Sequence, residues 1–262
     1  MQKLPNTSIN IETLNWLLIN QLYSGGEGII CRGFDDKSVF KVFADWNYRK
    51  KQFKEGRTIK PEEIQMTDNK LEKIKLLYQK DPDYMVKPLS TLSCNGVLIG
   101  YEQTFDPNDF SFDQEGLPRN ASVHFLDESM QALEYFKRQD MIYGDVSNSN
   151  LLINIKTGRV KFCDIDNMQI GNYKIDRSGT TLTIYSVIRG LDEYADAYMH
   201  NIMSLRVIAP PRVYKHEPAY HLVKEDYSQS LTEKGLETLE SMHNIKDFNG
   251  NYLTPYIKRR RA

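Results

Sequence analysis

The chain has 262 residues, of which 40% are hydrophobic and 26% are charged, and its 34 basic and 35 acidic residues give a net charge of -1. This composition is typical of a globular chain with a sizeable core, and it excludes disordered and fibrous proteins. The near-neutral balance gives no electrostatic footprint for a nucleic acid or an anionic membrane surface. We therefore expect neither of these partners.

The cysteines and the N-terminus indicate the compartment. Cys31, Cys94 and Cys163 are far apart in the sequence, so they form no zinc-binding pair, and their odd number argues against a disulfide framework. The N-terminus has no apolar signal core, and the most apolar early run, residues 16–19, is too short to span a bilayer. We expect a cytoplasmic protein with no membrane anchor.

The first elements in chain order are a helix and a hairpin. Thr7 or Ser8 can cap a helix that continues to about Gln21, because apolar residues recur there at helical spacing. A glycine cluster ends this helix. Residues 29–32 and 38–43 are rich in β-branched and aromatic side chains and flank a polar turn, which predicts a β-hairpin.

A second helix and two more strands follow. Residues 50–79 are highly charged, and the second half of this stretch has one apolar face, which predicts a helix. Residues 81–83, Asp-Pro-Asp, end it, and 86–92 and 96–103 have the composition of strands. We expect a first lobe that is mainly β with one helix.

The second half of the chain has a different pattern. A helical periodicity covers 127–139, and short strands are predicted at 141–143, 151–153 and 160–163, the last two flanking a Thr-Gly turn. The remainder favours helices. Pro, Asn, Asp and Gly cluster within 105–117, so we place the boundary between the two lobes there.

The most informative motif follows the 141–143 strand. Gly144 and Asp145 are followed by four residues and Asn150, then by strand, turn, strand and Asp164. This order resembles the catalytic and metal-binding segments of the protein kinase-like superfamily, including its aminoglycoside phosphotransferase-like branch. Phosphoryl transfer needs one carboxylate near the acceptor hydroxyl, and an amide oxygen and a second carboxylate on Mg²⁺. From the residues alone, an Asx-rich turn between two strands is the alternative.

The resemblance covers about residues 20–205 and implies a fold. It implies an α+β, two-lobed protein kinase-like fold that forms a single domain over 1–262. The N-lobe, about 1–104, would hold an antiparallel sheet plus one helix, and the C-lobe, about 105–262, would be mainly helical. ATP and Mg²⁺ are the implied cofactors.

The resemblance also implies roles within the motif. Asp145 would be the catalytic base or the carboxylate that orients the acceptor hydroxyl, and Asn150 and Asp164 would bind the metal ion. We prefer Asp164 to Asp166 as the metal ligand because Lys161 and Asp164 match the family's K-x-x-D run, although either carboxylate could serve.

A second motif lies upstream. Gly25, Gly26 and Gly28 precede the strand that carries Lys41. This order resembles a kinase glycine-rich loop that is followed, two strands later, by the lysine of the family motif. Tyr23 stands in place of the first glycine of that loop. Glycines let backbone amides close over phosphates, and a lysine places a point charge against them. A plain turn is the alternative for the loop taken alone.

Two acidic residues complete the implied nucleotide site. The resemblance calls for a helical glutamate that pairs with Lys41, and we choose Glu72, with Glu62 and Glu63 as alternatives nearer in sequence. Glu102 would lie at the hinge between the lobes, where backbone groups meet the adenine.

Several positions depart from the family pattern. Tyr143 and Gly144 replace the usual His and Arg, so regulation through that Arg is not expected, and Ser147 replaces a phosphate-contacting Lys of protein kinases. Downstream, Asp196 opens a stretch that resembles the central helix of the second lobe, whose Asp supports the catalytic loop. A competing alignment takes residues 209–211 as a degenerate A-P-E motif.

These features predict a Mg²⁺- and ATP-dependent kinase that moves the γ-phosphoryl group to a hydroxyl. Our first choice of acceptor is a protein Ser or Thr, because no large substrate-capping insertion is evident. A small-molecule kinase is the alternative acceptor class. A pseudokinase that acts as a nucleotide-binding scaffold is the rival without activity, and transfer of AMP is a third option.

Overall fold

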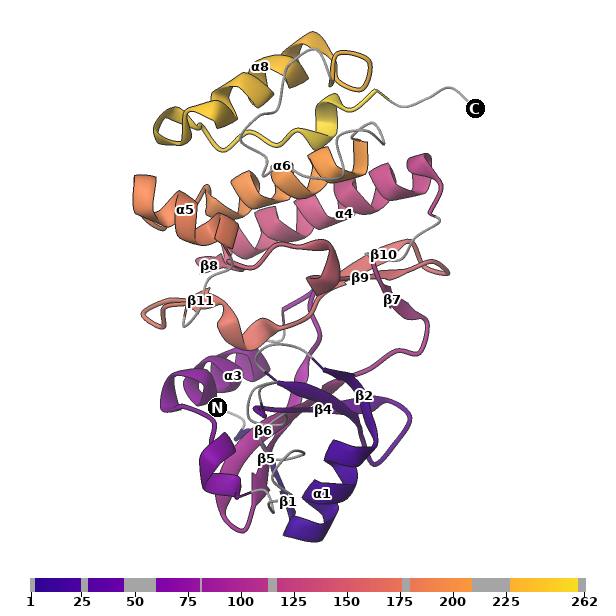
Figure 1. Cartoon of the computed structure of the whole chain (residues 1–262), viewed down its shortest axis with the longest axis vertical. Coiled ribbons are helices and arrows are strands. Elements are labelled where there is room, and N and C mark those ends of the chain that lie inside the picture. Colours follow the sequence, from indigo (N-terminus) through magenta and orange to yellow (C-terminus); the bar gives the residue numbers. More distant parts are fainter. Residues whose placement is uncertain are drawn as a thin grey trace, which may run out of the picture. The chain divides into compact units, whose positions relative to one another are not determined.

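The computed structural model describes residues 3–24, 28–44, 60–80, 82–112, 117–175, 180–208 and 227–258 (Figure 1). The chain divides into two compact units, Met1–Pro107 and Asn108–Ala262. This division lies inside the 105–117 segment in which we placed the boundary. The fold is mixed α+β, with an antiparallel-rich sheet in the first unit and most of the helices in the second, which confirms the fold class at that level.

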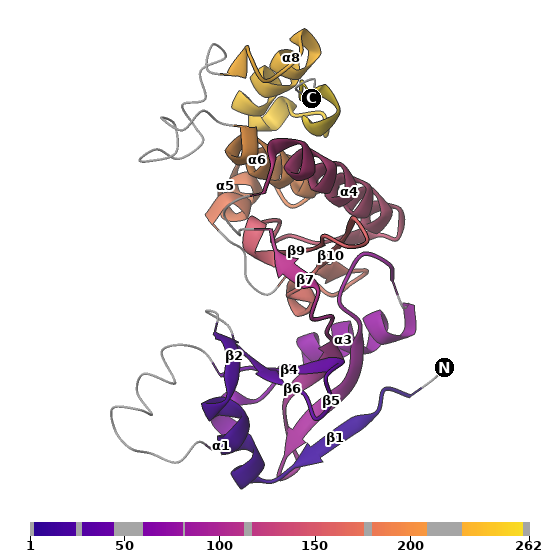
Figure 2. The same ribbon diagram turned by 90° about the vertical axis from the view of Figure 1, so that its right-hand side faces the viewer.

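A six-stranded sheet organises the first unit, in the order β1-β5-β6-β4-β3-β2. Its strands are β1 (Asn6–Ile9), β2 (Gln21–Ser24), β3 (Ile29–Arg32), β4 (Ser38–Val42), β5 (Pro88–Cys94) and β6 (Val97–Thr104). All neighbouring pairs are antiparallel except β1 and β5, which run parallel (Figure 2). Every residue of β4 is buried, so this strand lies in the middle of the core.

The start of the chain differs from the prediction. Thr7 lies in β1 rather than in a helix, and its hydroxyl lies 2.8 Å from that of Ser90 on β5, while Asn6 Oδ1 accepts a 2.9 Å bond from Thr91. Helix α1 (Ile11–Ile19) starts later, and Asn10 caps it by accepting a bond from the Thr13 amide. Pairing with a strand more than eighty residues away overrides the local helical pattern.

The helices of the first unit are short. A 3₁₀ turn, η1 (Pro61–Ile64), precedes α3 (Asp68–Lys80), which lies where the helix was predicted, in the second half of the charged stretch. At its start, Thr67 Oγ1 accepts a bond from the Lys70 amide. The buried side chains of α3 are Lys73, Ile74 and Leu77. A fully buried lysine on the core face of a helix is unusual, and periodicity of apolar residues does not reveal it.

The second unit contains two small sheets. A three-stranded antiparallel sheet has the order β10-β9-β7, with β7 (Asp109–Ser111), β9 (Leu151–Asn154) and β10 (Arg159–Phe162). β8 (Met141–Ile142) pairs with β11 (Gln169–Ile170). The predicted hairpin around the Thr-Gly turn is therefore present, whereas β7 was not predicted.

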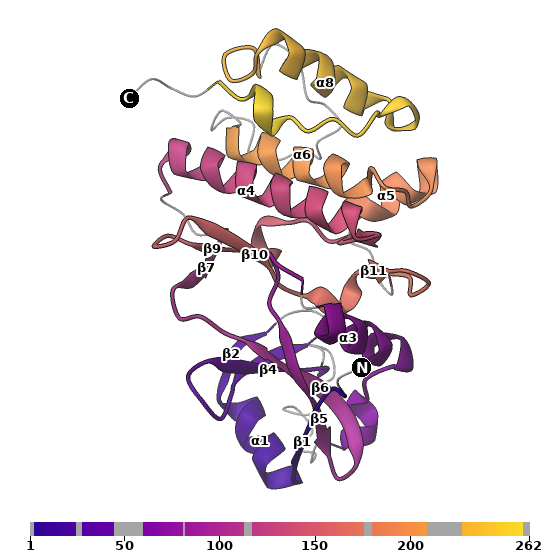
Figure 3. The same cartoon turned by 180° about the vertical axis from the view of Figure 1, so that it is seen from behind.

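The other elements of the second unit, within its described residues, are helical. They are α4 (Arg119–Arg138), α5 (Thr180–Arg189), α6 (Ala195–Ile208) and α8 (Glu233–His243), with short 3₁₀ turns η2 (Asn148–Asn150), η3 (Ile165–Asn167), η5 (Ile245–Asp247) and η6 (Thr254–Tyr256). α4 and α6 lie side by side in both front and back views (Figures 1 and 3). In the part of the chain that the structure describes, no helix combines the length and apolarity needed to cross a membrane.

α6 is the central helix of this unit, because every side chain from Ala195 to Leu205 is buried. His200 is fully buried and lies 2.9 Å from Ser129 Oγ and 3.2 Å from the Leu126 carbonyl oxygen on α4. Burial lowers the pKa of His200 to about 4. This histidine is therefore a neutral core residue whose Nε2 has hydrogen-bond partners on α4.

Candidate functional site

The segment between β8 and β9 carries the predicted catalytic motif, and α6 fixes its backbone. Asp196 Oδ2 accepts a 2.6 Å bond from the Tyr143 amide, and Asp196 Oδ1 accepts a 2.8 Å bond from the Gly144 amide. Burial raises the pKa of Asp196 to about 6, although these two bonds act in the opposite direction. One buried carboxylate thus sets the path of the chain that leads into Asp145.

Tyr143 links this segment to the end of the β9–β10 hairpin. Its ring packs against Phe162 at a centroid distance of 4.6 Å and stacks on Phe136 at 6.4 Å. Its hydroxyl donates a hydrogen bond to the Cys163 carbonyl oxygen. Burial, together with the nearby Cys163 and Asp164, raises the pKa of this hydroxyl well above its usual value, so it stays protonated and remains a donor.

Asp145 and Asn150 are in direct contact. Asn150 Nδ2 donates to Asp145 Oδ2 at 2.7 Å and to the Asp145 carbonyl oxygen at 3.1 Å. Because the amide nitrogen faces Asp145, Asn150 keeps Oδ1, the only side-chain atom with which it can bind a cation. Asn148, in the same loop, has a buried Oδ1 that finds no hydrogen-bond partner among the residues described.

Asp164 follows the other strand of the hairpin. The Cys163 amide donates to the Asn150 carbonyl oxygen at 3.0 Å, which places Asp164 beside the loop. Asp164 has a left-handed backbone, with φ 60° and ψ 42°, before η3 begins. A non-glycine residue in this region costs about 1 kcal/mol or more, and such strain is typical of functional sites. Asp166 is fully buried whereas Asp164 is partly exposed, so Asp164 is the more accessible of the two candidate ligands.

Lys41 and Gly28 belong to the first unit. Lys41 lies on β4 between Ile30 of β3 and Tyr101 of β6, and it is only 4% exposed. A Cβ added to Gly28 would lie 2.7 Å from the Val42 carbonyl oxygen and 3.6 Å from Lys41 Cε. The end of the glycine loop therefore approaches the lysine strand more closely than a side chain permits. Gly25 and Gly26 lie outside the described residues.

The helical glutamate does not lie as expected. Glu72 Oε1 is 2.6 Å from Lys75 Nζ, so Glu72 pairs with a lysine on its own helix rather than with Lys41. The reason is geometric: Lys75 is one turn away, whereas the core face of α3 carries Lys73. Glu62 and Glu63, the two alternatives, are exposed on η1.

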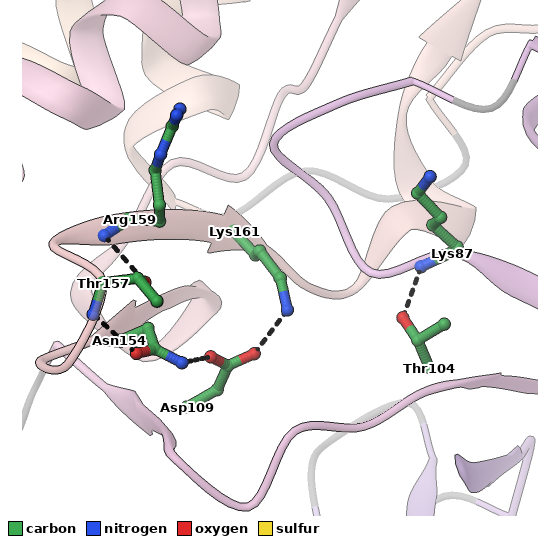
Figure 4. A network of polar contacts seen from close by, with 7 residues as sticks. All are labelled: Lys87, Thr104, Asp109, Asn154, Thr157, Arg159 and Lys161. Carbon is green, nitrogen blue, oxygen red and sulfur yellow. Dashed lines mark hydrogen bonds and ion pairs between the residues drawn. The ribbon is translucent and has the colours of Figure 1, made fainter. Parts of the chain in front are cut away.

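The predicted hinge residue lies inside the sheet. Glu102 pairs with Phe40 of β4 and Ser90 of β5, and its Oε2 accepts a 2.8 Å bond from Ser90 Oγ. Two residues later, the Thr104 amide donates to the Lys87 carbonyl oxygen at 2.9 Å. The Lys87 amide donates to Thr104 Oγ1, also at 2.9 Å (Figure 4). The backbone that we expected to meet the adenine is thus part of the hydrogen-bonded sheet.

The donor set within the second unit suits a small hard cation. A carboxylate on Asp164 and an amide oxygen on Asn150 are the oxygen ligands that Mg²⁺ uses when phosphates complete its coordination. Among the described residues, no group of three or more His, Cys, Asp or Glu side chains could hold a metal by itself.

No protein-family model matches the chain, and no curated protein matches it. The residues and their geometry are therefore the grounds for assigning a function.

Proposed function

We propose that this chain is a Mg²⁺- and ATP-dependent phosphotransferase of the protein kinase-like superfamily. One observation carries the proposal. The carboxylate of Asp196 holds two backbone amides of the loop that presents Asp145, and Asp145 in turn lies 2.7 Å from Asn150 at the start of the hairpin that ends in Asp164. A loop held in this way suits phosphoryl transfer, in which catalysis consists mainly of positioning and electrostatics.

The order of the elements supports the proposal. Strands β2 to β6 are antiparallel neighbours in the order β5-β6-β4-β3-β2, and α3 lies between β4 and β5 in the chain. The resemblance implies such an antiparallel sheet with one helix, followed by a mainly helical lobe. Strand β1 and helix α1 are additions that the resemblance does not account for.

The side chains have distinct roles under this proposal. Asn150 Oδ1 and the Asp164 carboxylate would hold Mg²⁺, which neutralises charge on the nucleotide phosphates when it is bound. Lys41 and the backbone near Gly28 would face phosphate oxygens. Asp145 would orient the acceptor hydroxyl and accept its proton. The acceptor in the proposal is a protein Ser or Thr hydroxyl, for the reason given from the sequence.

The test is transfer of label from γ-³²P-ATP to the protein itself and to protein acceptors in the presence of Mg²⁺. We expect label with the wild type and a loss of at least about 100-fold in Asp145→Ala and in Asp164→Ala, because each removes a group that acts in the transfer. Glu237→Ala changes an exposed carboxylate on α8 and is the matched control.

The other outcomes separate the rivals. Binding of ATP with no transfer of its γ-phosphoryl group, either to protein or to small hydroxyl compounds, would support the pseudokinase. Label from α-³²P-ATP on protein would indicate AMP transfer. No binding of ATP would contradict the proposal as a whole.

A further inference from the structure

Asp109 opens β7 and bridges both strands of the β9–β10 hairpin (Figure 4). Its Oδ1 accepts a 2.8 Å bond from Asn154 Nδ2 on β9, and its Oδ2 accepts a 2.9 Å bond from Lys161 Nζ on β10. The Asp109 side chain is only 7% exposed, whereas that of Lys161 is 35% exposed. One buried carboxylate therefore ties two strands to a third.

The same network closes the turn of the hairpin. Asn154 Oδ1 accepts a 3.1 Å bond from the Thr157 amide, and Thr157 Oγ1 accepts a 3.4 Å bond from the Arg159 amide (Figure 4). Asn154 thus donates to Asp109 and accepts from the turn at once. Because each of these groups has a defined partner, the register of β9 on β10 is strongly specified.

The other end of this hairpin carries the candidate metal ligands. Asn150 immediately precedes β9, and Asp164 follows β10 by two residues. Leu151 pairs with Phe162, and the Cys163 amide donates to the Asn150 carbonyl oxygen. Both strands are only four residues long, so a change in their register would move Asn150 relative to Asp164.

β7 also contacts the loop directly. Ser111 Oγ donates a 3.3 Å bond to the Asn148 carbonyl oxygen, and the Phe112 amide donates to the Leu151 carbonyl oxygen at 2.8 Å. The strand that Asp109 opens therefore reaches from the turn of the hairpin to the residues around Asn150.

We infer that Asp109 is a positioning residue for the metal site. Its carboxylate sets the separation and register of β9 and β10, and through them the places of Asn150 and Asp164. This inference rests on the proposed function, because it concerns how Mg²⁺ is bound there. Groups that orient metal ligands without touching the ion are known to change metal affinity by about 10- to 100-fold.

Three substitutions separate the contact of Asp109 with Asn154 on β9 from its contact with Lys161 on β10. Asp109→Ala removes both contacts. Asp109→Asn keeps one oxygen that can accept a hydrogen bond, but its NH₂ group faces Asn154 Nδ2 or Lys161 Nζ, which are both donors. It therefore removes one of the two contacts. Lys161→Met keeps the aliphatic part of the side chain and removes only the contact of Asp109 with β10. Because Lys161 is partly exposed, this variant should disturb folding least.

The experiment is calorimetric titration of ATP into the full chain, with Mg²⁺ at graded concentrations and without Mg²⁺. Mg²⁺ should increase the affinity for ATP, and we expect Asp109→Ala to raise the Mg²⁺ concentration that gives half of this increase about 10-fold. Lys161→Met should raise the same concentration by a smaller factor. ATP affinity without Mg²⁺ should stay the same in all variants, because Lys41 and the glycine loop are unchanged. The double variant Asp109→Ala, Lys161→Met should match Asp109→Ala alone.

A control of comparable instability completes the design. Leu239 is fully buried on α8, and Leu239→Ala leaves a cavity in the same unit without altering the hairpin. It should lower the melting temperature but leave the Mg²⁺ dependence unchanged. An equal shift in Leu239→Ala, or wild-type Mg²⁺ dependence in the Asp109 variants, would overturn the positioning role. A wild type that binds no Mg-ATP would instead overturn the proposed function.

Discussion

Two ionisable side chains one turn apart on α6 should give opposite pH dependences of stability. Burial raises the pKa of Asp196 from 3.8 to about 6 and lowers the pKa of His200 from 6.5 to about 4. Between pH 4 and 6 the folded protein therefore holds a protonated Asp196 and a neutral His200, whereas the unfolded chain holds the reverse. Each state binds one proton from the pair, so the two contributions cancel in this range.

Removing one partner exposes the contribution of the other. The raised pKa of Asp196 contributes stability that is present below pH 3.8 and is lost as the pH rises through 6. The lowered pKa of His200 contributes stability that is present above pH 6.5 and is lost as the pH falls through 4. Each term amounts to about 2–3 kcal/mol between pH 4 and 7, since one pKa unit corresponds to about 1.4 kcal/mol.

The assay is urea unfolding of the wild type, Asp196→Asn and His200→Gln at pH 4, 5, 6 and 7. The free energy of unfolding of Asp196→Asn, relative to wild type, should rise by about 2–3 kcal/mol from pH 4 to 7, and that of His200→Gln should fall by a similar amount. Differences that stay constant with pH, or that share one sign, would refute the burial argument.

Three further predictions concern single contacts. Tyr143→Phe removes the bond to the Cys163 carbonyl oxygen, so the free energy of unfolding in urea should fall by about 1 kcal/mol. Gly100→Ala should lower it by about 1–3 kcal/mol in the same assay, because a Cβ there would collide with the Lys41 carbonyl oxygen and push β6 from β4. Under the proposed function, Lys41→Met would remove the positive charge that faces the nucleotide phosphates, and it should weaken ATP binding at least about 10-fold by calorimetry, whereas a merely structural lysine would leave binding intact.

Local patterns predicted much of the fold. The hairpin of β3 and β4, the strands β5 and β6, and the hairpin of β9 and β10 each have alternating or β-branched sequences with turn residues between them. The segment around Asp145 was singled out because its Gly, Asp and Asn residues stand at the spacing of a kinase-like motif. Asp196 was assigned to support of the catalytic loop from the family resemblance, and its bonds to Tyr143 and Gly144 are the contacts expected for that role.

Long-range contacts explain what the sequence did not reveal. β1 forms because Thr7 and its neighbours pair with β5, and no local sequence pattern predicts a parallel partner strand more than eighty residues away. Asp109 lies in a stretch of turn-forming residues, so its bridge between Asn154 and Lys161 could not be predicted. Glu72 was chosen for its place in the middle of the helix, but its side chain pairs with Lys75, and the buried face of α3 carries Lys73 instead.

The most direct test of the central claim is calorimetric titration of ATP into the wild type and Asp164→Ala, each with and without Mg²⁺. The proposed function predicts that Mg²⁺ tightens ATP binding to the wild type and that Asp164→Ala loses this tightening while it retains the Mg²⁺-free affinity. Equal binding with and without Mg²⁺ in the wild type, or unchanged tightening in Asp164→Ala, would contradict it.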